Sequence, residues 1–277
     1  MTMSLTDVAI EQFNAAFQNE YQASRKLEGV GQVVRGVVGD AYKFKLVTAA
    51  QAQLRGASQS PIPASDLTYT APTVSFNNWV VNYPTDIFDQ AEVNANERKN
   101  LALEIAIALG RREDQFLIDA FDASGTTKTV AVGTTNLTKA KLISAAKLLN
   151  DDEVPMEERH AIIGSSQLDS LLRDTDVTST DYNNVRALVN GQLDTFMGFK
   201  FHVIGDRKEG GLTKTVNNRD VFFCHTRSVG LAYGLDPTVS VDWSAERQSY
   251  LSIGKVRGGA VAIDTKGIVK VTCDETK

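Results

Sequence analysis

The most constraining feature of this sequence is a proline-free helical pattern over residues 96–123. Asn94 and Glu97 form a capping pattern at its start, and Gly125 stands where a C-terminal cap belongs. A helix of this length spans about 42 Å. Its central part is apolar on more than one face, through Leu101, Leu103, Ile105, Ile107 and Leu109. We therefore expect this part to be enclosed on several sides.

Two strand patterns before this helix indicate a long two-stranded arm. Residues 29–48 place Val, Tyr and Phe at alternate positions with a turn at Gly39-Asp40, and strand signals resume over residues 67–81. A loop rich in Gly, Ser and Pro, residues 53–66, separates them. An isolated hairpin is only marginally stable in water, so an arm of this length implies a neighbour on which to lie.

The N-terminus predicts a short amphipathic helix. Ser4 and Asp7 fit a capping box. An apolar stripe follows at spacings of three and four, formed by Ile10, Phe13, Phe17 and Tyr21. A stripe this aromatic must dock on its own chain or on another one.

The remainder alternates between helix and strand patterns and places the chain in the α+β class. We expect helices at 137–150 and 165–172, a strand at 159–163, and a hairpin over 189–205 that turns near Met197-Gly198. From Asp220 onward, five strand-like runs are separated by turn residues: VFFCH, VGLAY, VSVDW, YLSIGKV with GGAVAI, and IVKVTC.

The charge balance excludes a dedicated nucleic-acid binder. The 277 residues carry 29 Lys and Arg against 34 Asp and Glu, a net charge of −5, whereas such binders usually show a basic excess. The longest apolar runs are far shorter than the roughly 18–20 residues of a spanning helix, and no secretory pattern opens the chain. Nothing here indicates a membrane protein.

No constellation in the sequence has the pattern of a catalytic, cofactor or metal site, so we expect no enzyme. GVGQVV at 29–34 has Val34 where a dinucleotide fingerprint needs its third glycine. His160, His202 and His225 lie far apart, and Cys224 and His225 are strand neighbours that point to opposite faces. The acidic run 151–158 and the pairs Arg98-Lys99 and Arg111-Arg112, with their acidic neighbours, are interpreted as solvated loops and as surface or inter-subunit ion pairs.

The order of these elements resembles that of the major capsid proteins of tailed bacteriophages with the HK97-type fold. The segments that carry the resemblance are VVNYPTDIFDQAE (80–92), LALEIAIALGRREDQFLIDAF (101–121), VPMEERHAIIGSSQLDSLLRD (154–174), GQLDTFMGFKFHVIGD (191–206) and YLSIGKVRGGAVAIDTKGIVKV (250–271). The resemblance implies five parts: an N-terminal arm (1–40), an extended hairpin or E-loop (41–91), a P-domain (92–155) with the spine helix 96–123, an A-domain (156–235), and a return to the P-domain sheet (236–277).

The resemblance also implies a function. Such proteins assemble as hexamers and pentamers into an icosahedral virion head around double-stranded DNA, which they contact non-specifically, and they assemble in the host cytoplasm. Their partners are further copies of themselves, a portal and in some cases scaffolding or decoration proteins. Since only about ninety residues precede the spine pattern, we expect any scaffolding function to reside in a separate protein.

Six residues are candidates for contacts between subunits, and three other functions stay open. The candidates are Phe13, Phe17 and Tyr21 on the arm and Arg55, Tyr69 and Trp79 on the hairpin. The aromatic ones could equally pack within their own chain. The other functions are an encapsulin-type compartment shell, marked by a cargo-peptide pocket, a minor head or decoration protein, marked by low copy number, and a soluble α+β enzyme, marked by a pocket with convergent titratable groups.

Overall fold

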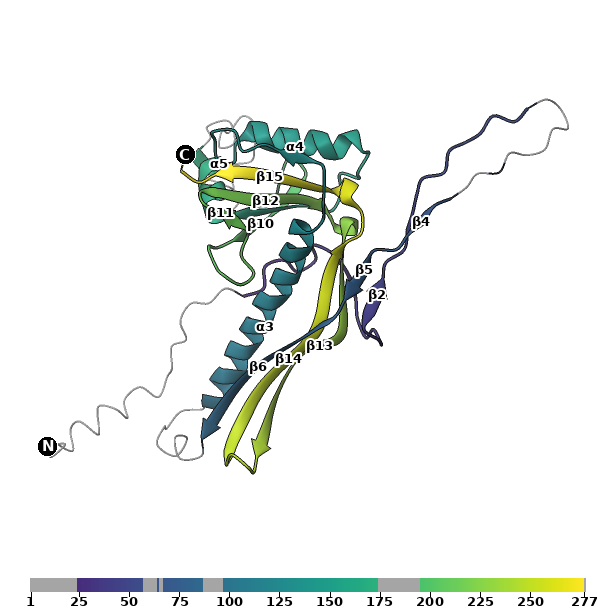
Figure 1. Ribbon diagram of the computed structural model, residues 1–277. Coiled ribbons are helices and arrows are strands. Elements are labelled where there is room, and N and C mark those ends of the chain that lie inside the picture. The colour runs from purple at the N-terminus through teal and green to yellow at the C-terminus, as the bar shows by residue number, and fades with distance from the viewer. Residues whose placement is uncertain (1–23, 57–63, 65–66, 87–96, 174–194, 277) are drawn as a thin grey trace.

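The computed structural model describes residues 24–56, 64, 67–86, 97–173 and 195–276. They form two β-sheets that meet along one long helix, with a two-stranded hairpin projecting from the side (Figure 1). The chain is therefore of the mixed α+β class.

The long helix α3 spans Glu97–Asp122 and lies along a four-stranded sheet. The strands of this sheet run in the order β1 (Gln32–Val34), β13 (Val229–Ser244), β14 (Ser249–Ala262) and β6 (Asn77–Asp86). Helix and sheet approach closely at Gly254, where an added Cβ would lie 2.2 Å from Ile105 Cγ2. Only a residue without a side chain fits there.

The fully enclosed part of the helix lies nearer its C-terminus than expected. Leu103 is 54% exposed, whereas Leu117, Ile118 and Phe121 are at most 1% exposed. The N-terminal half of α3 rests on one sheet, but its C-terminal half also reaches the second sheet, where Phe121 stacks on Phe222 at 5.3 Å between ring centroids. The surroundings of the helix, which its own sequence does not specify, decide which stretch is fully covered.

The second sheet has seven strands and carries two helices. Six strands run in the order β7 (Thr129–Val130), β15 (Ile268–Asp274), β12 (Asn218–His225), β8 (Arg159–Gly164), β10 (Phe199–Ile204) and β9 (Thr195–Phe196), and β11 (Lys214–Thr215) pairs with β12. The helices are α4 (Lys139–Asp151), which is capped by Thr138, and α5 (Ser165–Arg173). Two 3-10 turns connect the two sheets. η1 (Thr226–Ser228) lies between β12 and β13, and η2 (Thr265–Gly267) lies between β14 and β15.

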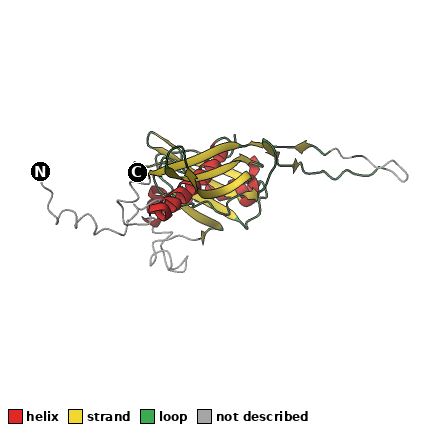
Figure 2. Ribbon diagram, turned by 90° about the horizontal axis from the view of Figure 1, so that it is seen from below, coloured by secondary structure: helices red, strands yellow, loops and turns green. Residues whose placement is uncertain are grey.

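The hairpin consists of two short antiparallel ladders. β2 (Ala41–Lys43) pairs with β5 (Thr73–Ser75), and β3 (Leu46–Val47) pairs with β4 (Tyr69–Thr70). Further out, the side-chain amide of Gln53 donates to the carbonyl of Ala64 at 3.3 Å. Seen from below, the hairpin extends well beyond the body (Figure 2). This confirms the predicted protruding arm.

Most local predictions are confirmed, but the division of strands differs. The helices near 137–150 and 165–172, the strand near 159–163 and the turn at Met197-Gly198 are all present. However, VGLAY and VSVDW form one continuous strand, β13, with register shifts between Tyr233 and Thr238. Pro237 is tolerated because β1 pairs only with 230–232, which leaves the flank of β13 at the proline without a partner among the described strands.

The sheets consequently do not follow the expected domain boundaries. The boundary expected at 235/236 falls inside β13. β7 and α4 were expected in the same domain as the long helix, but β7 is a strand of the second sheet and α4 packs on that sheet. β15, expected in the sheet of the long helix, pairs with β12 and β7 instead. Strand pairing between segments that are distant along the chain sets these memberships, and no local pattern reports it.

Candidate assembly surfaces

The root of the hairpin is fixed on the four-stranded sheet by two buried apolar side chains. Phe44 is 6% and Val74 2% exposed, and both pack with Ala232 in a small separate core. The Phe44 ring occupies the place of a side chain at Gly230, since a Cβ there would lie 2.4 Å from the ring. Arg257 donates to the Asp40 carboxylate at 2.7 Å. The hairpin thus leaves the body in a defined direction.

Beyond this root, the hairpin exposes apolar side chains. Tyr69 is 68% exposed and Leu54 97% exposed, and Val47 and Leu67 are also exposed. Arg55 lies among them and is exposed too. The described part of the chain does not cover these side chains. This part of the hairpin therefore has the composition of a surface that is buried in an assembly.

Trp79, by contrast, packs largely on its own chain. It lies on β6 and is half-buried, with the Arg112 guanidinium 3.5 Å from its ring centroid and the Phe116 ring at 6.4 Å. Phe13, Phe17 and Tyr21 lie outside the described residues. A contact with a neighbouring subunit stays a prediction for all six candidates.

Residues 24–34, here called the strap, run from the joint between the two sheets to β1. Leu27 and Val30 are completely buried. The buried carboxylate of Asp114 accepts hydrogen bonds from the backbone N–H groups of Lys26 at 2.9 Å and Leu27 at 3.0 Å, and from the Arg207 guanidinium at 2.6 Å. This carboxylate ties the strap to the middle of α3.

Glu113 provides a second anchor for the strap. It pairs with Arg25 at 2.9 Å and accepts a hydrogen bond from the buried Tyr233 hydroxyl. Burial and the neighbouring Glu113 raise the pKa of Tyr233. The expectation that the pair Arg111-Arg112 and its acidic neighbours form surface or inter-subunit ion pairs is therefore wrong for Glu113 and Asp114, which are both buried. The signal that sequence reasoning missed is a pair of acidic residues followed by the apolar run Phe116-Leu117-Ile118.

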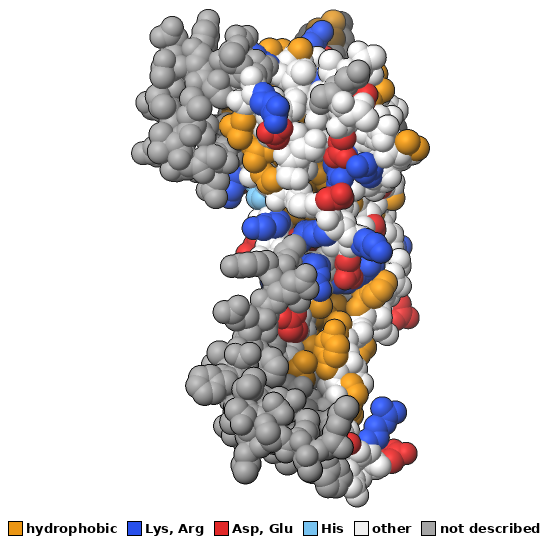
Figure 3. Space-filling model, turned by 90° about the vertical axis from the view of Figure 1, so that its left-hand side faces the viewer, with side chains coloured by type: hydrophobic (Ala, Val, Ile, Leu, Met, Phe, Trp, Pro, Cys, Tyr) orange, Lys and Arg blue, Asp and Glu red, His pale blue; other side chains and the backbone are white. Residues whose placement is uncertain are grey.

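A further apolar strip lies on the distal half of β13. Val239, Val241 and Trp243 are 38%, 42% and 46% exposed, and the Trp243 ring contacts Tyr250 on β14 at 4.9 Å. On the side of the molecule shown in Figure 3, hydrophobic side chains also gather below a band in which basic and acidic side chains alternate. Apolar patches bordered by mixed charges are typical of protein–protein contacts.

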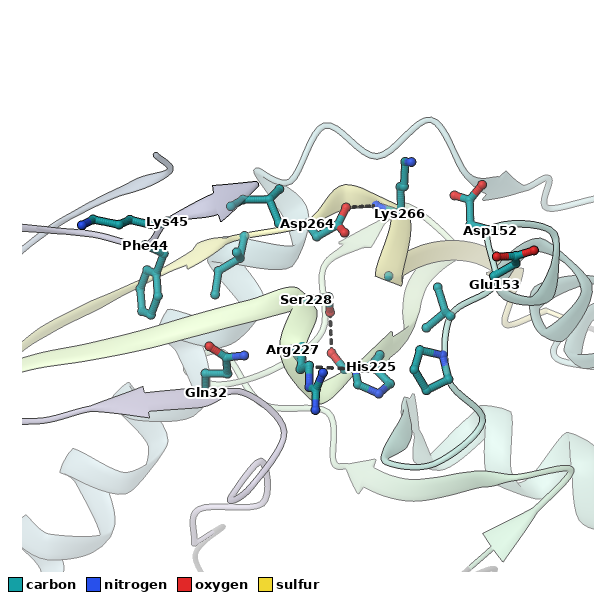
Figure 4. Close-up of a pocket in the computed structure, with 15 residues that line it drawn as sticks. Gln32, Phe44, Lys45, Asp152, Glu153, His225, Arg227, Ser228, Asp264 and Lys266 are labelled. Carbon is teal, nitrogen blue, oxygen red and sulfur yellow. Dashed lines mark hydrogen bonds between the residues drawn. The ribbon is translucent and has the colours of Figure 1, made fainter. Parts of the chain in front are cut away.

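A cavity of about 370 Å³ lies where the hairpin root meets both sheets (Figure 4). Its walls come from the hairpin at 44–46, the turn 152–155, η1 and η2. Acidic and basic side chains face it in balance, and Asp152 is already paired with Lys128, which lowers the pKa of Asp152. The ring of His225 accepts a hydrogen bond from the backbone N–H of Arg227 at 3.1 Å. These groups hold turns together and do not converge on a substrate position.

The described residues contain no arrangement suited to catalysis or metal binding. Burial raises the pKa of the Cys224 thiol, and it raises that of Cys273 to about 12, so neither is a ready nucleophile. In the part of the chain that the structure describes, no group of three or more His, Cys, Asp or Glu residues could hold a metal ion. Within the same residues, no helix is long and apolar enough to cross a membrane.

The histidines depart from expectation. His160 on β8 and His202 on β10 lie on neighbouring strands, and their rings approach to 3.0 Å between Nδ1 of His160 and Nε2 of His202. The 42 residues that separate them in the sequence predicted no contact. Parallel strand pairing joins them, and that pairing has no short-range signature.

Known structures share this fold. The chain superposes on a chain from the capsid of the cyanophage P-SCSP1u with a TM-score of 0.79 at 15% identity, covering 99% of this chain and 95% of that one. For a chain of Mycobacterium phage Che8, the TM-score is 0.71 at 17% identity, with 95% of both chains covered. For the head structure of Helicobacter pylori bacteriophage KHP40, it is 0.74 at 9% identity, with 94% and 93% covered.

Sequence comparison places the chain in a family. A search of the curated proteins found no match. The model of a family described as phage capsid protein, however, matches residues 5–275. Because this match covers nearly the whole chain, the protein belongs to the phage capsid protein family and is a major capsid protein that forms a phage head.

Proposed function

We propose that this protein builds an icosahedral head as hexamers and pentamers and that the head encloses double-stranded DNA. In this proposal the hairpin is the E-loop, which lies on a neighbouring subunit, and residues 1–23 contact another one. Head-to-tail contacts that close into rings suit such capsomers. The shell role needs shape and contacts, and it requires neither catalysis nor a cofactor.

The hairpin is the observation that carries the proposal. It is rooted by buried Phe44 and Val74, yet it exposes Tyr69, Leu54 and Leu67 beyond the root. A ribbon held in a fixed direction, with apolar side chains that its own chain leaves uncovered, is built to be covered by a partner. A second copy is the partner that a shell supplies at every position.

The remaining assignments fit this reading. We assign residues 1–23 to the arm, the hairpin from β2 to β5 to the E-loop and α3 to the spine helix of the P-domain, and we assign the second sheet to the A-domain. The net charge of −5 favours weak, non-specific contact with packaged DNA, because phosphate binding needs basic groups. A portal, a separate scaffolding protein and decoration proteins are the expected further partners in the virion, and assembly is expected in the host cytoplasm.

Electron microscopy of particles formed by Tyr69→Asp, Tyr69→Phe and the unchanged protein tests this proposal. Tyr69→Asp places a charge on the exposed ribbon, so we expect shell yield to fall at least tenfold, whereas Tyr69→Phe keeps the ring and should assemble normally. Thermal unfolding of unassembled subunits should be the same for all three, since Tyr69 is 68% exposed. Normal shells from Tyr69→Asp would refute the role of this residue.

A further inference from the structure

The imidazole pair of His160 and His202 is connected at both ends. On one side, Nδ1 of His202 lies 3.0 Å from the carbonyl oxygen of Lys26 in the strap. On the other, Nε2 of His160 lies 3.0 Å from the Thr226 hydroxyl, which itself lies 3.3 Å from the carbonyl oxygen of Glu158. The ring centroids are 5.1 Å apart, as for rings that meet end to end through a hydrogen bond. A chain of contacts thus runs from Lys26 in the strap through His202 and His160 to Thr226 in η1.

The acceptor at the strap sets the proton positions of the whole chain. A carbonyl oxygen can only accept, so Nδ1 of His202 carries a proton, and in the neutral ring its Nε2 is then an acceptor. Nδ1 of His160 must therefore donate to it. Nε2 of neutral His160 is left as an acceptor for the Thr226 hydroxyl. At neutral charge, every group in the chain has a partner.

One extra proton finds a hydrogen-bond partner in this chain of contacts, although burial disfavours its charge, and a second proton finds no partner. If Nε2 of His160 is protonated, the Thr226 hydroxyl accepts from it and turns its own proton to the Glu158 carbonyl oxygen. If His202 is protonated as well, two N–H groups face each other across 3.0 Å, and two positive rings repel at that distance. The contact between the rings then breaks, and with it the position of the ring that holds the Lys26 carbonyl.

The surroundings keep the pair neutral in the closed structure. The charged and titratable groups around it are Lys200 on β10, His225 on β12, Asp114 on α3, and Glu157, Glu158 and Arg159 beside the cavity at Gly29. Burial, and then His202, Lys200 and His225, lower the pKa of His160 from 6.5 to about 4. Burial also lowers the pKa of His202, although the Lys26 carbonyl and Asp114 oppose this.

We propose that the His160–His202 pair is a proton-controlled latch that holds the strap when both rings are neutral and releases it on acidification. The direction follows from linkage. In the open state the rings return to water and take protons near pH 6.5, whereas in the closed state the pKa of His160 is lowered to about 4 and that of His202 is also lowered. The hold is complete above pH 6.5 and weakens as the pH falls towards 4.

Hydrogen exchange at the Lys26 and Leu27 amides, measured on assembled shells of the full chain, tests the latch. After correction for intrinsic exchange, we expect protection of these two amides to fall about 20-fold between pH 7 and pH 5, the factor by which proton uptake at His160 alone favours opening. Amides in the middle of β12 should keep their protection. Unchanged protection of Lys26 and Leu27 down to pH 4 would overturn the proposal.

Two variants separate the latch from other acid effects. His160→Gln with His202→Gln keeps hydrogen-bonding side chains but removes both titrating rings, so the loss of protection between pH 7 and pH 5 should disappear. His225→Gln leaves both rings in place, so protection should still be lost between pH 7 and pH 5, with at most a small shift of the midpoint because His225 also lowers the pKa of His160. If the double variant still loses protection, another group controls the strap and the latch is wrong.

A spectroscopic measurement on the unchanged protein covers the case in which the double variant does not fold. Solid-state ¹⁵N spectra of shells at pH 7 should show both rings neutral with the proton on Nδ1. A proton on Nε2 of either ring at pH 7 would contradict the hydrogen-bond chain and overturn the proposal.

Discussion

The strap and the hairpin both lie within the first ninety residues, but they differ in how far the rest of the chain buries and anchors them. The strap buries Leu27 and Val30 completely and is tied to α3 through two carboxylates. The hairpin is fixed only at its root, and Leu54 further out is 97% exposed. The strap is therefore part of the fold, whereas the hairpin leaves its apolar side chains uncovered and, in our proposal, contacts another subunit. Mutations should affect subunit stability in the first and assembly in the second.

The largest effect should come from Asp114→Ala in the strap anchor. The substitution leaves the buried guanidinium of Arg207 and two backbone N–H groups without their acceptor, which should lower the free energy of unfolding by about 3–5 kcal/mol. Urea unfolding of unassembled subunits measures it. Asp236→Ala removes the exposed pair with Arg35 and serves as the control, with an expected loss below about 1 kcal/mol. Equal losses in both variants would contradict a buried anchor.

The next effect should come from Leu27→Ala, compared with Leu54→Ala. Leu27 is 0% exposed, so its truncation should create a cavity and cost about 2–4 kcal/mol of unfolding free energy. Leu54 is 97% exposed, and its truncation should leave subunit stability within about 0.5 kcal/mol. The same urea titration reports both values. A cost at Leu54 comparable to that at Leu27 would erase the distinction between strap and hairpin.

The smallest stability effect should come from Gly230→Ala at the hairpin root. The added methyl group meets the Phe44 ring at 2.4 Å, so the ring must shift, at a cost of about 1–3 kcal/mol. The shift also changes the direction of the hairpin, and we expect misshapen shells in electron micrographs. Gly205→Ala is the matched control, because an added Cβ there has no neighbour within 4 Å. Regular shells from Gly230→Ala would show that the root direction is not critical.

The sequence predicted what depends on neighbours along the chain. The extent of α3 follows from its proline-free helical pattern, and the turn at Met197-Gly198 and the paired strands of the hairpin follow from turn chemistry and alternation. The assembly role rested on the order of such elements and on the exposed character of the arm, and the family match confirms it.

What the sequence did not reveal depends on segments that are distant along the chain. Gly234 to Pro237 has the composition of a turn, but pairing with β14 carries β13 through it with two shifts of register. Asp114 resembled a surface acid because its partners, the strap amides and Arg207, lie roughly 90 residues away on either side. The histidine pair likewise exists only because β8 and β10 run side by side.

The contact between Phe44 and Gly230 also determines how the subunit transmits a mechanical load. A load at the hairpin tip acts on a long arm whose pivot is this contact, and Arg257 braces the arm at Asp40. The load passes into β13, which is paired with β14 along most of its length and reaches the 3-10 turn beside the second sheet. If the hairpin holds a neighbour as proposed, a pull on one hairpin strains the joint between both sheets, and a shell of such subunits can share stress from one copy to the next.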